Sequence, residues 1–174
     1  YDDAGGAIAA RLWWLLQWLG HEASALLDGG WQRWIEEGRN LGKGPVYSLA
    51  STVKAAPPQK QVCNFREVLA TPHSTDILLL DTRNAERFQG LRESIDPITG
   101  HIPGACNEPF QVNLDYKGLW KTPDVLHRQY LERFPELPRK KVVSYCGSGV
   151  TACHTFFALL YAGFGNTLIY PGSW

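Results

Sequence analysis

The chain has 174 residues, 44% of them apolar, which is enough to bury the core of about one domain. Its 17 Lys and Arg residues balance 17 Asp and Glu residues, so no charge excess favours nucleic acid or an anionic membrane as a partner. Four cysteines without a Cys-x-x-Cys pair predict reduced thiols in a cytoplasmic protein, and five scattered histidines argue against a metal site. No cofactor is predicted.

The first predicted element is an apolar helix over Ala7–Leu19. It is too short to span a bilayer and contains Arg11 and Gln17. The chain starts without Met or a basic segment, so this helix is not expected to be a signal peptide. Its tryptophans predict that it packs on the rest of the chain or on a partner. A short strand is predicted next, over Ala23–Trp31 with Ser24–Leu27 at its centre.

Residues 39–61 are rich in Gly, Pro, Lys and Ser and predict a linker. A second domain is expected from residue 62 to the end of the chain. Asn64 followed by Glu67 predicts a capping box in front of a helix over Phe65–Ala70. The apolar run Ile77–Leu80 predicts a parallel strand that is buried on both faces.

The pattern then predicts a polar loop, a helix and two further strands: 84–100, Pro123–Phe134, Lys140–Tyr145 and Thr167–Tyr170. Strands that alternate with helices predict an α/β fold, a parallel sheet flanked by helices. Ligands of such folds bind at the carboxyl ends of the strands, which is where Asp81 and Cys146 both fall.

The most informative stretch is Val142–Ala152. A run of β-forming residues stops at Cys146, a loop with two glycines follows, and an apolar helix is predicted over Thr151–Tyr161. The glycines allow successive backbone N–H groups to point inward, and the helix N-terminus adds partial positive charge. A cysteine at this turn is predicted to be stabilised as the thiolate, its nucleophilic form.

Other uses of this turn fit the residues less well. A phosphate-binding loop needs a lysine, and none stands here. A cysteine phosphatase needs an arginine six residues after the cysteine, a position that Ala152 occupies. The remaining alternative is a buried structural cysteine, the usual fate of a free thiol.

The loop CGSGVTA resembles the active-site loop of the rhodanese superfamily, and more specifically its mercaptopyruvate sulfurtransferase branch. The thiosulfate branch usually carries basic residues where Gly147 and Ser148 stand. The resemblance extends through LLLDTR (Leu78–Arg83), GHIPGA (Gly100–Ala105) and PGSW (Pro171–Trp174). It implies a rhodanese-like fold and an enzyme that moves sulfur from a small-molecule donor to a thiol such as reduced thioredoxin, or to cyanide, through a Cys146 persulfide.

The resemblance also implies roles for the residues near Cys146. Ser148 would assist catalysis by donating a hydrogen bond to the donor or the leaving enolate; otherwise it is only a small loop residue. Arg87 would bind the anionic group of the donor, with a solvated loop charge as the alternative. The PEPR-like stretch of the mercaptopyruvate branch is missing here, so Arg92 is the expected substitute for its second arginine.

The loop itself is expected to complete the substrate-binding site through Gly147, Gly149, Val150 and Thr151. Asp81 and Arg83, at the end of the preceding strand, are expected to form a structural ion pair that orients the site.

The start of the chain repeats its end in a degenerate form. Gly5 aligns with Gly149 (149 − 5 = 144) and Trp31 with Trp174 (174 − 31 = 143), so one deletion reconciles the two offsets. Position 2, the counterpart of Cys146, is Asp. Residues 1–38 are therefore expected to be the second half of an inactive rhodanese-like copy, as in tandem sulfurtransferases, and the chain to be a fragment.

The function expected from these observations is transfer of sulfur from 3-mercaptopyruvate to a thiol or cyanide. A thiosulfate sulfurtransferase is the near alternative, and a noncatalytic sulfur carrier or interaction module is the alternative of another class. The sequence leaves the donor, the physiological acceptor and the oligomeric state open.

Overall fold

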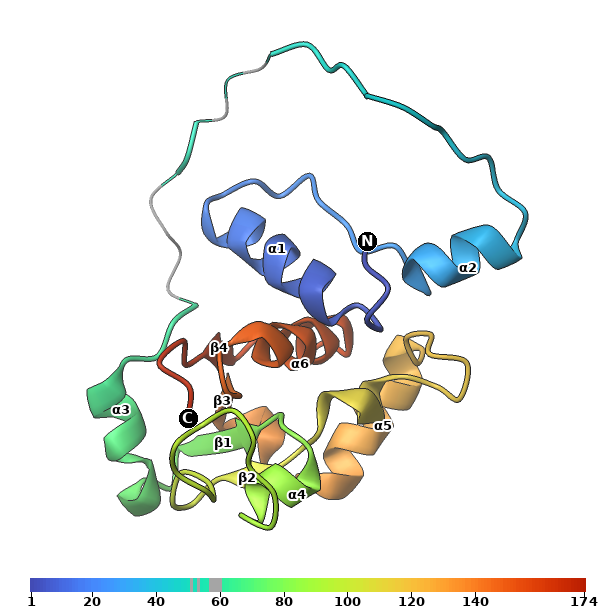
Figure 1. Ribbon diagram of the computed structural model, residues 1–174. Helices are drawn as coiled ribbons and strands as arrows, with labels where there is room; N and C mark the ends of the chain where they lie inside the picture. Colours follow the sequence, from blue (N-terminus) through green and yellow to red (C-terminus); the bar gives the residue numbers. More distant parts are fainter. Residues whose placement is uncertain (51, 53, 57–60) are drawn as a thin grey trace.

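The computed structural model describes every residue except 51, 53 and 57–60. Part of the linker predicted for residues 39–61 thus lies outside the described residues. Its other residues form no helix or strand and run as an extended path from the N-terminal helices to the remainder of the chain (Figure 1).

A parallel sheet forms the centre of the fold. Its strands are β1 (Ile77–Asp81), β2 (Cys106–Asn107), β3 (Lys141–Tyr145) and β4 (Thr167–Ile169). They lie in the order β2-β1-β3-β4, and all three pairings are parallel. The predicted α/β fold is therefore confirmed, although the two-residue strand β2 was not predicted.

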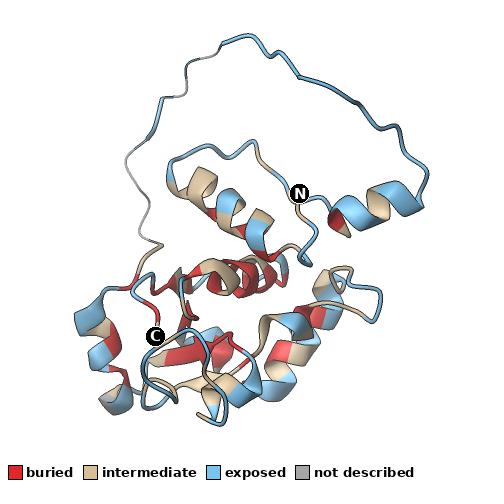
Figure 2. Cartoon of the chain, in the orientation of Figure 1, coloured by how far each residue is buried: buried red, intermediate tan, exposed pale blue. Residues whose placement is uncertain are grey.

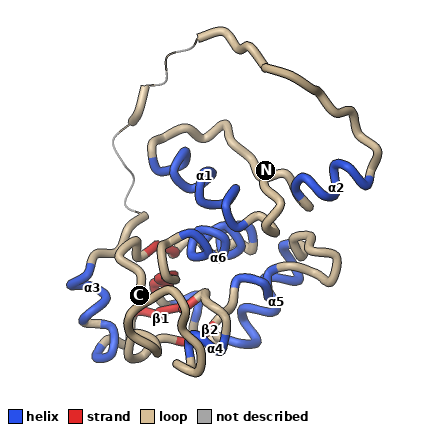
Figure 3. Tube along the Cα trace, in the orientation of Figure 1, coloured by secondary structure: helices blue, strands red, loops and turns tan. Residues whose placement is uncertain are grey.

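Helices cover both faces of this sheet (Figure 3). The α-helices are α1 (Ala7–Trp18), α2 (Gly30–Glu36), α3 (Phe65–Leu69), α4 (Ala85–Phe88), α5 (Pro123–Arg133) and α6 (Val150–Tyr161). Short 3-10 helices span Thr71–His73, Phe110–Asn113 and Leu137–Arg139. Helix α3 has the predicted capping box: the Asn64 side chain accepts from backbone N–H groups, and the Glu67 carboxylate accepts from the Asn64 N–H at 2.8 Å.

The strands bury alternate side chains on opposite faces, as the pleat of a strand requires. Leu78 and Leu80 of β1 pack in one buried cluster with Tyr130 of α5. Leu79, between them, packs on the other face with Val68 of α3. From Ile77 to Leu80 the strand is apolar because its side chains pack on both faces of the sheet.

Helix α1 packs against α6, so that its apolar face is covered within the chain (Figures 1 and 2). Trp14 is 2% exposed and lies in one cluster with Cys153 and Phe156 of α6. Trp13 meets Phe157 edge to face, with ring centroids 5.0 Å apart. The expectation that the tryptophans mark a packing face is confirmed. Among the described residues, no helix has both the length and the apolar composition to cross a bilayer.

Two predictions for residues 1–100 are wrong in detail. The strand predicted over Ala23–Trp31 does not form: residues 21–27 belong to no helix or strand, and α2 already begins at Gly30 (Figure 3). A strand exists only where a neighbour pairs with its backbone, and no described strand lies beside this segment. The polar loop predicted for residues 84–100 contains the short helix α4, which Asn84 caps by accepting from the Arg87 N–H at 3.0 Å.

A buried polar chain ties the N-terminal segment to the rest of the fold. His154 of α6 is fully buried and stacks on Trp120, with ring centroids 4.0 Å apart. Its Nδ1 lies 3.4 Å from Asn113 Nδ2, and its Nε2 lies 3.2 Å from the carbonyl oxygen of Gly5. Burial lowers the pKa of His154 to about 4, so the ring is neutral at pH 7.

This histidine predicts a stability loss in mild acid. Between its ordinary pKa and about 4, the unfolded chain binds a proton that the folded chain does not, so stability falls as the pH falls through this window. The free energy of unfolding, measured by urea titration, should decrease by about 3 kcal/mol from pH 7 to pH 4 on account of His154. His154→Gln should remove this part of the slope, whereas the exposed-residue control His21→Gln should retain it; equal slopes in all three proteins would contradict the assignment.

Candidate active site

Cys146 follows β3 directly and is 3% exposed. Two backbone hydrogen bonds fix the chain on either side of its side chain. The Thr82 N–H donates to the Tyr145 carbonyl at 2.9 Å, and the Trp174 N–H donates to the Cys146 carbonyl at 2.8 Å. The sulfur thus has a fixed position at the carboxyl end of the sheet, where ligands of parallel α/β folds bind.

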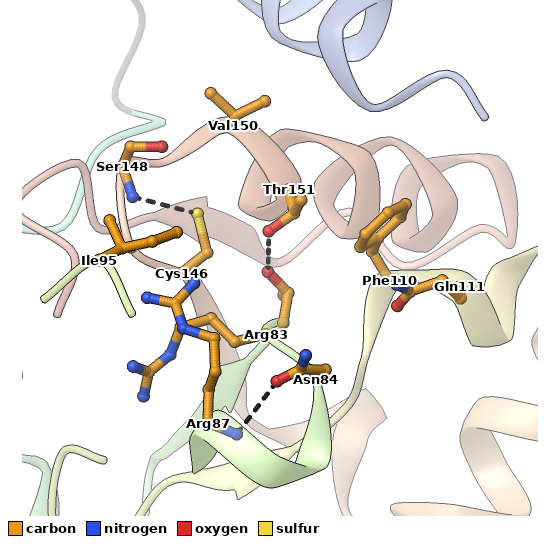
Figure 4. Close-up of a pocket in the computed structure, with 12 residues that line it drawn as sticks. Arg83, Asn84, Arg87, Ile95, Phe110, Gln111, Cys146, Ser148, Val150 and Thr151 are labelled. Carbon is orange, nitrogen blue, oxygen red and sulfur yellow. Dashed lines mark hydrogen bonds between the residues drawn. The ribbon is translucent and has the colours of Figure 1, made fainter. Parts of the chain in front are cut away.

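The loop after Cys146 aims its backbone N–H groups at the sulfur (Figure 4). The Gly149 N–H donates to Sγ at 3.0 Å and the Ser148 N–H at 3.4 Å. Gly149 has φ +79°, a conformation that residues with a Cβ rarely adopt, and α6 begins at the next residue. Glycine is required here so that the chain can turn from strand to helix around the sulfur.

Opposing effects set the pKa of Cys146. Burial raises it, but hydrogen bonds from the Thr151 hydroxyl and from backbone N–H groups of the loop outweigh burial, so the pKa is lowered. Burial without such donors raises the pKa of Cys63 to about 12, and burial is also the first cause that raises the pKa of Cys153 to about 11. Cys106 is shifted upward as well. Among the four thiols, Cys146 alone has an environment that favours the thiolate.

A pocket of about 270 Å³ opens in front of the sulfur. The cysteine loop lines it with Cys146, Gly147, Ser148, Val150 and Thr151. The opposite wall comes from the segment after β1, which contributes Thr82, Arg83, Asn84 and Arg87, and from Ile95, Phe110 and Gln111 (Figure 4). The predicted loop residues are therefore together at one pocket, with Gly149 behind them as a donor to the sulfur.

The lining includes residues that were not predicted as site residues. Thr82 is fully buried, and its hydroxyl lies 2.9 Å from the hydroxyl of Thr151. The Thr151 hydroxyl is the one that donates a hydrogen bond to the Cys146 sulfur. Thr82 was present in the LLLDTR motif, so its position at a strand end was a usable signal. Phe110 and Gln111 belong to a short 3-10 helix with no motif, and nothing in the sequence pointed to them.

Asp81 and Arg83 form the expected buried ion pair. Arg83 Nη2 lies 2.6 Å from Asp81 Oδ2, and Nε donates to both carboxylate oxygens at 3.0 and 3.1 Å. Nη2 also donates to the Gly100 carbonyl at 2.7 Å. Arg83 has a second position in the site that was not predicted, because its side chain also lines the pocket.

Arg87 stands beside the cysteine loop and is held by two carboxylates. Its Nε donates to Glu93 at 2.9 and 3.1 Å, and its Nη2 donates to Asp96 at 2.6 Å. A Cβ at Gly147 would lie 3.4 Å from Arg87 Nη2, which places the guanidinium against the loop. The alternative of a freely solvated charge is ruled out by this geometry.

Arg92 is not brought to the pocket. Its side chain is 77% exposed, and the nearest carboxylate is that of Glu86, 3.9 Å away. The predicted role of Arg92 as the second donor-binding arginine therefore lacks geometric support. Within the described part of the chain, no three His, Cys, Asp or Glu side chains are arranged to hold a metal ion.

The sequence is similar to those of known sulfurtransferases. The chain is 41% identical over 175 residues to a probable 3-mercaptopyruvate sulfurtransferase of Pseudomonas aeruginosa, covering 100% of the chain and 62% of that relative. It is 31% identical over 173 residues to a thiosulfate sulfurtransferase of Gallus gallus, covering 99% of the chain and 60% of the relative. The chain thus spans about 60% of the length of these relatives.

The fold has close counterparts among solved structures. The crystal structure of SseA from Escherichia coli, described as a 3-mercaptopyruvate sulfotransferase, superposes with a TM-score of 0.85 at 32% identity, covering 100% of this chain and 65% of that one. The family described as "Rhodanese-like domain" matches residues 65–174, which is more than half of the chain and includes the whole sheet and the cysteine loop. The chain therefore belongs to the rhodanese-like family.

Proposed function

We propose that this chain carries the catalytic cysteine of a sulfurtransferase that moves sulfur from 3-mercaptopyruvate to a thiol or to cyanide through a Cys146 persulfide. One observation carries the proposal: the Cys146 sulfur receives backbone N–H groups at 3.0 and 3.4 Å, and its pKa is lowered although it is buried. An anion at this sulfur is what the chemistry needs.

The reaction runs in two half-reactions. The Cys146 thiolate attacks the donor sulfur, the carbon–sulfur bond breaks, and its electron pair leaves with the pyruvate carbon as an enolate that then takes up a proton. An acceptor thiolate or cyanide next attacks the outer sulfur of the persulfide, and Cys146 departs as the thiolate. Backbone donors at the sulfur favour the anionic form in each half-reaction, and the covalent intermediate implies ping-pong kinetics.

The pocket supplies groups for the donor as well. Arg87 lies against the cysteine loop, and a guanidinium suits a carboxylate. Ser148 is exposed at the pocket, where its hydroxyl can donate to the departing enolate oxygen. Val150 and Thr151 complete the wall on the loop side, while Arg83 and Asp81 hold the opposite wall in place.

Thiosulfate is the alternative donor, which the likeness to the Gallus gallus thiosulfate sulfurtransferase supports. The small, uncharged Gly147 and Ser148 favour mercaptopyruvate, because no cation follows the cysteine to balance a dianion. A thiol protein such as thioredoxin as acceptor, and the cytoplasm as location, remain parts of this proposal. If neither donor transfers sulfur to Cys146, the alternative function of a noncatalytic sulfur carrier is favoured.

We also propose that residues 1–38 are part of a second, inactive rhodanese-like copy, that residues 39–61 link it onward, and that 62–174 form the catalytic domain. The loop before α1 supports this. The Asp2 carboxylate accepts four backbone N–H groups at 2.7 to 3.0 Å, much as the Cys146 sulfur does. The glycine that directly precedes α1 is Gly6, which pairs with Gly149 before α6 at the offset of 143 shared by the tryptophans, rather than Gly5.

Mass spectrometry of the intact protein tests the transfer reaction. Incubation with 3-mercaptopyruvate should add one sulfur, and later cyanide should remove it. Cys146→Ser should gain none, whereas Cys153→Ser should gain one, because Cys153 is a buried thiol whose pKa is raised. Full loading of Cys146→Ser would refute the assignment of the nucleophile.

Alkylation rates test the origin of the lowered pKa. Thr151→Val should raise the pKa of Cys146, because a hydrogen bond to a charged sulfur is lost. The pH at which iodoacetamide modification is half-maximal should shift upward accordingly, and Thr151→Ser should restore it. An unchanged pH profile in Thr151→Val would assign the lowered pKa to the backbone alone.

A further inference from the structure

The guanidinium proposed to bind the donor already has a carboxylate on it. Asp96 Oδ2 lies 2.6 Å from Arg87 Nη2. A Cβ at Gly147 would lie 3.5 Å from this same oxygen and 3.4 Å from Arg87 Nη2, so the ion pair sits at the wall of the cysteine loop. A donor anion that binds to Arg87 Nη2 must therefore compete with Asp96.

The two carboxylates on Arg87 are held differently. Glu93 is 2% exposed, and its Oε1 accepts from the backbone N–H groups of Ser94, Ile95 and Asp96 at 2.9 to 3.1 Å. The hydrogen bond from Arg87, with these backbone donors, lowers the pKa of Glu93 to about 2. Glu93 is therefore a fixed anchor that orients Arg87 through Nε.

The Asp96 carboxylate accepts fewer hydrogen bonds than that of Glu93. Among the described residues, its carboxylate pairs with Arg87 Nη2 at 2.6 Å and approaches Arg83 Nη1 at 4.0 Å. Within the described part of the chain, no backbone N–H group donates to its carboxylate, whereas three donate to Glu93. A donor anion can thus displace Asp96 without moving Arg87, which Glu93 still holds.

The ionised side chains on this wall of the pocket carry no net positive charge. Two cations, Arg83 and Arg87, face three buried or half-buried carboxylates, those of Asp81, Glu93 and Asp96. Their sum is 2 − 3 = −1. Each further negative charge on the donor is repelled by this excess, so a dianion is disfavoured more than a monoanion.

We infer that Asp96 determines donor specificity: by occupying Arg87 Nη2 and adding one negative charge, it selects monoanionic α-keto carboxylate donors over the dianion thiosulfate. The inference rests on the proposed function, since it assigns the donor class of the same pocket. Asp96 acts through Arg87 and is a specificity-determining residue.

Steady-state kinetics with both donors test it. A unit charge about 4 Å from the bound anion changes binding about fivefold per donor charge in water-like screening. Asp96→Asn should therefore lower KM about fivefold for 3-mercaptopyruvate and about 25-fold for thiosulfate, with little change in kcat. The thiosulfate preference, as a ratio of kcat/KM values, should rise about fivefold.

Two control variants separate this effect from other causes. Glu86→Gln removes the same charge from an exposed position on α4, where the side chain is 59% exposed, and should leave both KM values unchanged. Asp96→Glu keeps the charge and should leave the donor ratio unchanged. A donor ratio that stays constant or falls in folded Asp96→Asn overturns the inference.

A second readout does not need sulfur transfer. Sulfate and pyruvate should protect Cys146 from iodoacetamide, and Asp96→Asn should improve protection by sulfate about fivefold more than protection by pyruvate. Equal changes for the two anions would overturn the inference even if neither donor loads the wild-type chain. Failure of both donors to load, together with the expected protection, would instead overturn the proposed function alone.

Discussion

The fold is arranged around one electrostatic requirement, a negative charge on a buried sulfur. Burial alone disfavours the thiolate, as the raised pKa values of Cys63 and Cys153 illustrate. Only at Cys146 do a strand end, a left-handed glycine and a helix start combine to place N–H groups 3.0 and 3.4 Å from the sulfur. The parallel sheet positions that turn, and the last residue of the chain fixes it through the Cys146 carbonyl.

Much of this arrangement could be predicted from the sequence because strong local signals set it. The apolar runs of β1 and β3, the capping box at Asn64 and the glycines around Cys146 each encode their own conformation. Every helix and strand predicted from residue 62 onward was found within one residue of its expected ends. The cysteine loop was predictable for the same reason: its geometry depends on neighbours in sequence.

The features that escaped prediction depend on contacts between distant segments. A strand at Ser24–Leu27 needs a partner strand, which local sequence cannot supply. Arg92 carries the right charge, but the path of residues 84–100 turns it to solvent. Phe110 and Gln111 reach the pocket only because a 3-10 helix follows β2. The ion pairs of Glu93 and Asp96 with Arg87 likewise form only when that loop is folded.

The proposed chemistry depends on the charge state of the Cys146 sulfur. A pH titration of thiolate ultraviolet absorbance, with the Cys146→Ser signal subtracted, measures it directly. The account predicts that one thiol titrates below the ordinary thiol pKa and that its signal is lost with Cys146. A Cys146 pKa at or above the ordinary value would contradict the account, because the backbone donors would then fail to offset burial.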